Sequence, residues 1–314
     1  MEKNMDILRP ILYYAIFPGF IFSAVVGLLT TWVDRKVTAR VQWRVGPPWY
    51  QPFADTVKLI GKEVVIPANA RRTGFLMMPV IGLAAATLAS TILWIVNLDP
   101  SKSFVGDSLV VIYIMTIPAV SMIIGASASG NPLGILGASR EMKLLFSYEL
   151  PLIISVLTAI VKVGSFSFKN ILAYQSEHGV IIWSISGIIA FIVAILCAQA
   201  KLTFVPFDIP EAETELAGGS HIEYSGVALA VVRLNMAIMF FVLPIFLITI
   251  FWGGISFDGW RILTSIVKYV VIVVIMVLIK NTNPRVRIDQ AVRFFWGPMF
   301  ILALAAIILA KLGL

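Results

Sequence analysis

The sequence predicts an all-α membrane protein that crosses the bilayer about eight times, and hydropathy, charge content and the spacing of apolar runs all predict this class. Of the 314 residues, 59% are hydrophobic and only 13% are charged, and the mean hydropathy is +0.94. Soluble domains do not combine such values. Apolar runs of about 20 residues recur along the chain, and each can cross the hydrocarbon core as a helix.

These apolar runs define the predicted spans in order. The spans fall near residues 11–33, 76–97, 108–129, 144–162, 180–200, 227–252, 263–280 and 296–312. The first run has no small-residue cleavage site before its charged end, which favours a retained span over a signal peptide. The fourth span is the weakest, because Lys143, Glu149 and Lys162 crowd its ends. Residues 1–314 are predicted to form a single membrane domain.

The distribution of cations predicts the orientation. Most of the 24 Lys and Arg residues lie in loops that follow odd-numbered spans. Because cytoplasmic loops retain Lys and Arg, the loops 34–75 and 201–226 are predicted to be cytoplasmic and both termini to lie outside. The same retention explains the formal net charge of +7 without nucleic acid as a partner. The expected location is the cell (plasma) membrane, as a multi-pass protein.

The first cytoplasmic loop contains a predicted short amphipathic helix over Gln51–Glu63, after a turn at Gly46-Pro47-Pro48. Its apolar and charged residues fall mostly on opposite faces, as in a helix that lies at the membrane interface. Two interpretations are open. The helix is either a surface element held by anionic lipid, or a docking surface or cavity wall beneath a partner protein.

The loop between the fifth and sixth predicted spans concentrates carboxylates in Pro206–Gly226, PFDIPEAETELAGGSHIEYSG. They are Asp208, Glu211, Glu213, Glu215 and Glu223. No Lys or Arg lies between Lys201 and Arg233, so no cation close in sequence neutralises them. Like charges on one face raise one another's pKa, burial raises it further, and such a set exchanges protons as a coupled group. A solvated acidic loop is the alternative.

A short helix is predicted within this acidic loop. The Asp208-x-x-Glu211 spacing is typical of a capping box, Pro210 suits an early helical position, and the Gly218-Gly219 pair ends the helix after roughly two turns. On such a helix Glu211 and Glu215 would share a face.

Two charged residues are predicted to lie inside spans. Because Asn131-Pro132 is predicted to end the third span, 130–146 would be a short loop and Glu149 would lie about 7 to 8 Å into the fourth span. A carboxylate there faces protein interior or water, or it sits at the headgroup boundary. Arg233, in the sixth span, is predicted to pair with a carboxylate or to line a hydrated path. Asn235 lies on a different helical face and has no predicted role.

The sequence excludes a cysteine-based cofactor site. Cys197 is the single cysteine, and His178 and His221 are the only histidines. An iron–sulfur cluster, a cysteine zinc site or a disulfide within the chain is therefore excluded. No metal, catalytic group or redox cofactor is expected in this chain, so redox cofactors would belong to other subunits.

Two long motifs and a short one between them resemble a known family. They are WVDRKVTARVQWRVGPPWYQPFADTVKLIGKE (Trp32–Glu63), the acidic loop, and SYELP (Ser147–Pro151). They resemble the eight-span membrane-heel component of respiratory complex I, the NADH dehydrogenase subunit 1 family. They resemble still more closely its counterparts in energy-converting membrane-bound [NiFe] hydrogenases and related archaeal sulfur reductase complexes. The similarity covers essentially the whole chain.

The resemblance implies a non-catalytic membrane subunit that links electron transport in a peripheral arm to H⁺ or Na⁺ translocation. The implied partners are hydrogenase-like and iron–sulfur subunits, which would carry the iron–sulfur clusters and possibly [NiFe], antiporter-like membrane subunits, and the lipid bilayer. The positions that match its proton-coupling carboxylates are Glu149, Asp208, Glu211, Glu213, Glu215 and Glu223. The charged positions that match its arm-docking loop are Arg35, Arg40, Arg44, Asp55, Lys58, Lys62 and Glu63.

The sequence also departs from the family pattern. The segment Gly46–Pro52 is compressed, as in the hydrogenase type, which favours a complex without quinone reduction. Arg233-Leu234-Asn235 occupies a region where the family usually carries a Glu, which suggests that a cation biases the neighbouring carboxylates. Two other functions remain open: a quinone-chamber subunit of a complex I-type oxidoreductase, and a stand-alone secondary transporter with Arg233 and the acidic loop as its site.

Overall fold

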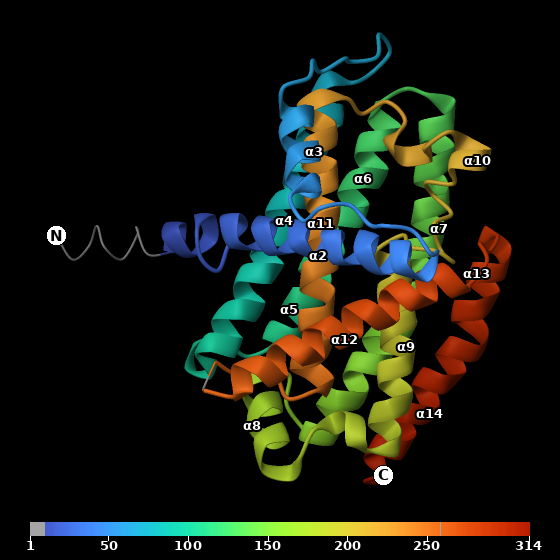
Figure 1. Cartoon of the computed structure of the whole chain (residues 1–314). Helices are drawn as coiled ribbons and strands as arrows, with labels where there is room; N and C mark the ends of the chain where they lie inside the picture. The colour runs from blue at the N-terminus through green and yellow to red at the C-terminus, as the bar shows by residue number, and fades with distance from the viewer. Residues whose placement is uncertain (1–9, 258) are drawn as a thin grey trace.

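The computed structural model describes residues 10–257 and 259–314, and the regular structure in these ranges is helical (Figure 1). Seven helices among them are long and apolar enough to cross a membrane, and Ile185–Lys201 is a shorter apolar helix of 17 residues. The short helix predicted after the Gly46-Pro47-Pro48 turn is also present, over Gln51–Ile60. The predicted all-α polytopic class is therefore confirmed.

The helices follow one another through short connections. Their bounds are α2 Phe20–Val41, α3 Gln51–Ile60, α4 Arg72–Leu98, α5 Asp107–Ile114, α6 Ile117–Ala128, α7 Pro132–Val163, α8 Phe168–His178, α9 Ile185–Lys201, α10 Glu213–Leu216, α11 Gly226–Phe251, α12 Arg261–Thr282, α13 Ile288–Phe294 and α14 Phe300–Lys311. Tight turns lie at η1 Pro100–Lys102, η2 Ile181–Trp183 and η3 Gly219–His221, and a π-helical turn, η4 Phe295–Met299, joins α13 to α14.

Helix α7 corrects one prediction. The side chain of Asn131 accepts a hydrogen bond from the backbone N–H of Leu133 at 2.8 Å, and Pro132 occupies the first turn, so the pair starts a helix. The predicted loop 130–146 is wrong, because its residues from 132 onwards form about four turns of this 32-residue helix. Glu149 consequently lies about 25 Å along α7 from its start.

Helix α11 is the centre of the bundle. Its most apolar segment is 89% buried, whereas those of α2, α12 and the α13–α14 unit are 28%, 28% and 22% buried. A helix that is apolar around its whole circumference is stable only when other helices surround it. Figure 1 shows α11 running through the middle of the bundle, with α2 and α12 crossing in front. The less buried helices therefore form the outer layer.

The connecting segments gather at two ends of the bundle. At the first end, segments 61–71, 129–131, 202–225 and 283–287 are joined. The joining contacts are Val65 N–H to Ser225 at 2.8 Å, Arg71 N–H to the carbonyl of Ala128 at 2.9 Å, and Val286 N–H to the carbonyl of Pro206 at 3.0 Å. At the other end, η1, α8, the 252–254 segment and the C-terminus meet. The contacts there are Ser103 with Ser167 at 2.6 Å, Gly253 N–H to Gln175 at 2.7 Å, and Ser186 to the carbonyl of Leu314 at 2.5 Å.

Candidate functional site

The segment 202–225 covers the first end of the bundle, and two glycines let it pack closely. A Cβ on Gly137 of α7 would lie 2.5 Å from the backbone nitrogen of Ser220. Gly219 has φ +52°, and a Cβ there would lie 1.8 Å from the carbonyl oxygen of Pro210. Backbone can approach this closely only where no Cβ intervenes. The segment is therefore held directly against α7.

We expect Gly137→Ala to displace the segment and to lower the free energy of unfolding by about 1–3 kcal/mol, as overpacking typically does. Thermal unfolding of the purified complex measures this change. Gly297→Ala is the matched control, because no heavy atom lies within 4 Å of a Cβ at that position. Equal melting temperatures for the two variants would contradict the close packing.

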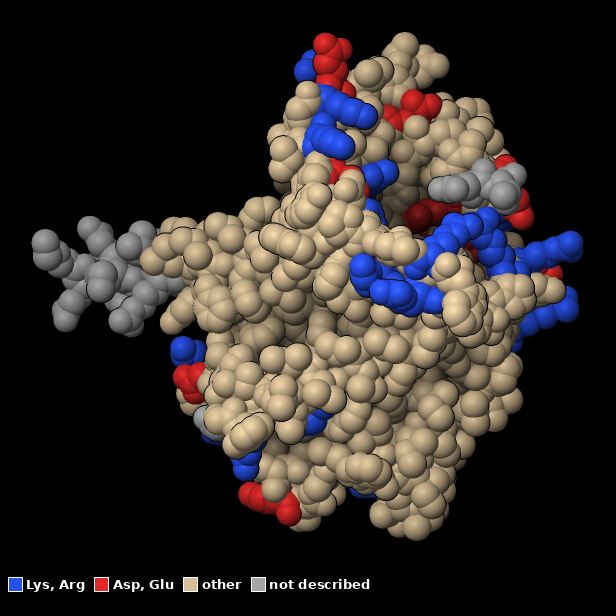
Figure 2. Space-filling view, viewed as in Figure 1, with Lys and Arg blue, Asp and Glu red and all other residues tan. Residues whose placement is uncertain are grey.

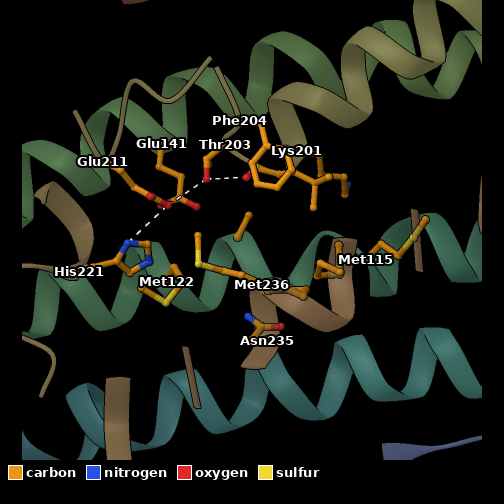
Figure 3. A pocket seen from close by; sticks show the side chains of 14 residues that line it. Met115, Met122, Glu141, Lys201, Thr203, Phe204, Glu211, His221, Asn235 and Met236 are labelled. Carbon is orange, nitrogen blue, oxygen red and sulfur yellow. Dashed lines mark hydrogen bonds and ion pairs between the residues drawn. The ribbon is translucent and has the colours of Figure 1, made fainter. Parts of the chain in front are cut away.

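A cavity of about 50 Å³ lies beneath the segment, among α6, α7, α11 and the end of α9 (Figure 3). Its polar lining consists of Glu141, Lys201, Thr203, Glu211, His221 and Asn235, and its other walls are mainly methionine and proline. This volume accommodates a few water molecules, and the polar groups around it can hold them. We call this space the central cavity.

Glu141 is the carboxylate that the sequence interpretation missed. Its residue is only 8% exposed, and its carboxyl group forms no hydrogen bond or ion pair with another described residue. Figure 3 shows Glu141 and Glu211 entering the cavity from the same side. The signal was present in the sequence, because Gly134, Ala138, Glu141 and Leu145 repeat at the spacing of one helical face.

Glu211 connects to two side chains across the cavity wall. Its Oε1 accepts a hydrogen bond from the hydroxyl of Thr203 at 3.0 Å and lies 3.5 Å from Nδ1 of His221 (Figure 3). Thr203 holds φ +51°, a left-handed conformation that is costly for a residue with a branched side chain. The fold therefore keeps a strained residue where its hydroxyl can reach Glu211.

The helix predicted from Asp208 to Gly218 is wrong. Residues 208–212 are not helical, and α10 is a single turn over Glu213–Leu216. The carboxylate of Asp208 pairs with Arg285 at 2.7 Å and so does not cap a helix. A charge-assisted pair with a distant segment outweighs a local cap. As a result, Glu211 and Glu215 do not share a helical face.

Asn235, for which no role was predicted, lines the central cavity from α11. It is 3% exposed, and its side-chain oxygen has no hydrogen-bond partner among the described residues. A buried oxygen without a partner costs roughly 1–3 kcal/mol. The cavity beside it offers room for a water that would remove this cost.

Glu149 forms a buried ion pair that no sequence pattern predicted. Its Oε2 lies 3.0 Å from Nζ of Lys201, and its Oε1 accepts a hydrogen bond from the hydroxyl of Thr116 at 2.7 Å. The Lys201 side chain is 1% exposed. Lys201 also lines the central cavity. This one lysine therefore contacts Glu149 and borders the space that contains Glu141 and Glu211.

The other predicted carboxylates have polar partners nearer the surface. Glu215 pairs with Arg140 at 2.6 Å, and Glu223 accepts a hydrogen bond from the side chain of Asn131. Asp208, Glu215, Arg140 and Arg285 border a second cavity of about 400 Å³. Burial raises the pKa of Asp208, and Arg285 partly opposes that rise. Cations distant in sequence thus lie beside the acidic loop, and the side chain of Glu213 lies outside the described residues.

The first loop holds its predicted charged residues in two groups. Arg35 donates to Asp55 at 2.8 Å, which joins α2 to α3, and the neighbouring Asp34 pairs with Lys280 of α12 at 2.8 Å. The remaining residues of the predicted docking set are exposed: Arg40, Arg44, Lys58, Lys62 and Glu63. Figure 2 shows Lys and Arg side chains gathered over this part of the surface. Arg233 is also exposed and lines a separate groove.

The contact between α2 and α3 should depend on pH. The hydrogen bond from Arg35 holds the pKa of Asp55 below its ordinary value of 3.8. The pair therefore stabilises α3 fully above pH 3.8, and this stabilisation, roughly 0.5 kcal/mol for a partly exposed pair, is lost as the pH falls through the lowered pKa. We expect Asp55→Asn to increase hydrogen–deuterium exchange of α3 at neutral pH. The difference from the unchanged protein should vanish in acid, and a difference that persisted there would contradict this role.

No group of three or more His, Cys, Asp or Glu within residues 10–257 and 259–314 is placed to hold a metal ion. The chemistry that this arrangement does support is proton exchange. Carboxylates, an imidazole and an ammonium group surround a space large enough for water, and each of them binds or releases protons.

Comparisons with known proteins match nearly the whole chain. A family model described as NADH dehydrogenase matches residues 14–311. A membrane subunit of the NADH-quinone oxidoreductase of Thermomicrobium roseum is 34% identical, over 96% of this chain and 95% of the relative. The NADH-quinone oxidoreductase subunit 8 of Thermus thermophilus is 33% identical, over 89% and 82% respectively. A chain in the structure of the membrane-bound sulfane sulfur reductase, an archaeal respiratory membrane complex, is 28% identical with a TM-score of 0.84, over 92% of this chain and 96% of that chain.

Proposed function

Since the chain belongs to the NADH dehydrogenase subunit 1 family of membrane subunits in respiratory complexes, we propose that it is the anchor and coupling subunit of a redox-driven ion pump. Electron transfer then takes place on partner subunits, which carry iron–sulfur clusters and, in a hydrogenase-type complex, [NiFe]. Antiporter-like membrane subunits move H⁺ or Na⁺. The role of this chain is to pass the energetic change from the first group of partners to the second.

The central cavity is the observation that carries this proposal. Glu211 and His221 belong to the surface segment 202–225, whereas Glu149 and Lys201 lie on spanning or apolar helices. Lys201 lines the cavity and pairs with Glu149, so a change of charge at Glu211 acts on the pair through Lys201. Electrostatic interactions act strongly across such a water-poor interior. Movement of the segment can thereby change the protonation of groups deep in the bundle.

The orientation of the chain follows from the proposed role. The end of the bundle that carries α3, the acidic segment and most Lys and Arg residues faces the cytoplasm, and both termini lie outside. The exposed cations of the first loop then face the peripheral arm. Because the segment 202–225 lies at the same end, an arm docked on the first loop would also contact the covering of the central cavity.

Purification of the complex through a tag on this chain tests the proposal. We expect iron–sulfur subunits and antiporter-like subunits to co-purify, as identified by mass spectrometry. In proteoliposomes, redox turnover should drive H⁺ or Na⁺ movement. Ion transport by the purified single chain without partners would instead support a secondary transporter and would contradict the proposed role.

A quinone-reducing complex is the second candidate, and the names of the curated relatives favour it, because both are NADH-quinone oxidoreductase subunits. The structural neighbour belongs to a sulfane sulfur reductase, and the compressed Gly46–Pro52 segment favours that type. Reduction of a soluble quinone by the purified complex, measured beside reduction of polysulfide and of protons, distinguishes the candidates.

A further inference from the structure

A groove of about 290 Å³ lies between α2, α3 and α11. Its wall is apolar at Leu28, Met236 and Phe240, and its charged residues are Asp34, Arg35, Asp55 and Arg233. Phe204 and Met236 line both this groove and the central cavity, so they separate the two spaces. We call it the Arg233 groove.

Every charge in the Arg233 groove except one has a partner. Asp34 pairs with Lys280 at 2.8 Å, and Asp55 pairs with Arg35 at 2.8 Å. Arg233 forms no hydrogen bond or ion pair with any residue in the described ranges, and its residue is exposed. The groove therefore carries one surplus positive charge.

The position of Arg233 makes an uncompensated charge costly. Helix α11 begins at Gly226, so Arg233 lies about 10 Å along it, inside a span that is otherwise apolar. A guanidinium group at such a depth requires a counter-charge or water. Because both carboxylates of the groove already bind other cations, the described residues supply no counter-anion. An anion from outside the chain would meet this requirement.

We propose that the Arg233 groove binds the headgroup of an anionic membrane lipid, with a phosphate oxygen on the guanidinium of Arg233 and an acyl chain along Leu28 and Phe240. Guanidinium groups bind phosphate through paired hydrogen bonds. Helix α3 borders the groove and exposes Val57 and Ile60, which are 68% and 56% exposed. An interfacial helix of this kind lies at the headgroup level of a bilayer. The surplus charge, the apolar wall and this depth favour a lipid over an acidic side chain of a partner protein.

Photo-crosslinking tests the proposal. The complete complex is placed in phosphatidylcholine nanodiscs that contain a photoactivatable phosphatidylglycerol, and cross-linked peptides are mapped by mass spectrometry. We expect cross-links on α2 and α11 beside the groove. Arg233→Gln should reduce them about tenfold, which is the loss expected for a charge-assisted hydrogen bond. Arg233→Lys should keep part of the labelling, because it retains the charge without the planar pair of donors.

Arg261→Gln is the control, because Arg261 is exposed and begins α12 at the other end of the bundle. It should leave the cross-links unchanged. Should Arg233→Gln prevent assembly, competition in the unchanged complex gives the same answer: unlabelled phosphatidylglycerol should displace the probe and phosphatidylcholine should not.

Three results would overturn the proposal. They are equal labelling in Arg233→Gln and unchanged complexes, equal displacement by a neutral quinone analogue, and a groove that a partner protein covers so that no lipid labels it. Lipid binding in the Arg233 groove does not depend on ion coupling, so this proposal and the proposed function can fail separately.

Discussion

Replacing Glu149 with alanine is expected to lower the free energy of unfolding by roughly 3–5 kcal/mol, the typical cost when one partner of a buried ion pair is removed. The reason is that Lys201, whose side chain is 1% exposed, would remain charged and without its carboxylate. Its remaining contacts are the hydroxyl of Thr116 at 3.1 Å and the ring of Tyr148 at 5.5 Å. Thermal unfolding of the purified complex measures the loss.

A double variant separates the ion pair from simple loss of packing. Replacing Glu149 and Lys201 together, by leucine and methionine, removes both charges and retains side-chain volume, so most of the stability should return. The double variant should still fail to couple redox turnover to ion movement, since Lys201 is the link to the central cavity. Glu177, exposed on α8, provides the control, and Glu177→Ala should leave stability unchanged. A Glu149→Ala protein as stable as this control would contradict the buried pair.

Glu141→Gln is expected to slow ion translocation by roughly 100-fold, the contribution typical of a positioned proton-transfer group, while redox turnover persists. The amide keeps the size of the side chain and cannot exchange a proton near neutral pH. Glu141 is the buried carboxylate in the cavity that has no partner among the described residues. Ion uptake into proteoliposomes, measured per electron transferred, gives the coupling ratio.

Two further variants define what the Glu141 result means. Glu211→Gln should lower the coupling ratio in the same way, because Glu211 joins the cavity to His221 and Thr203. Glu177→Gln should leave it unchanged. Full coupling in both cavity variants would show that protons do not pass through the central cavity, and the proposed coupling path would then be wrong.

The fold class could be predicted from local sequence because membrane crossing is a local property. About 20 consecutive apolar residues satisfy the bilayer in any context, since a helix makes its own backbone hydrogen bonds. The amphipathic helix after the Gly46-Pro47-Pro48 turn was predictable for the same reason. Local rules failed where a local signal competed with a distant partner, as at Asp208, and where Pro132 both ends one helix and starts the next.

The sequence by itself determined the helical membrane class, the family, and that carboxylates concentrate between the fifth and sixth predicted spans. Only the tertiary structure decided which of them are buried and what they contact. Glu149 meets Lys201 across 52 positions of sequence, and Asp208 meets the distant Arg285. Glu141 joins Glu211 in the central cavity only because α7 and the segment 202–225 pack together at Gly137. The physical reason is that the pairing and hydration of a charge depend on neighbours in space, which a sequence window does not contain.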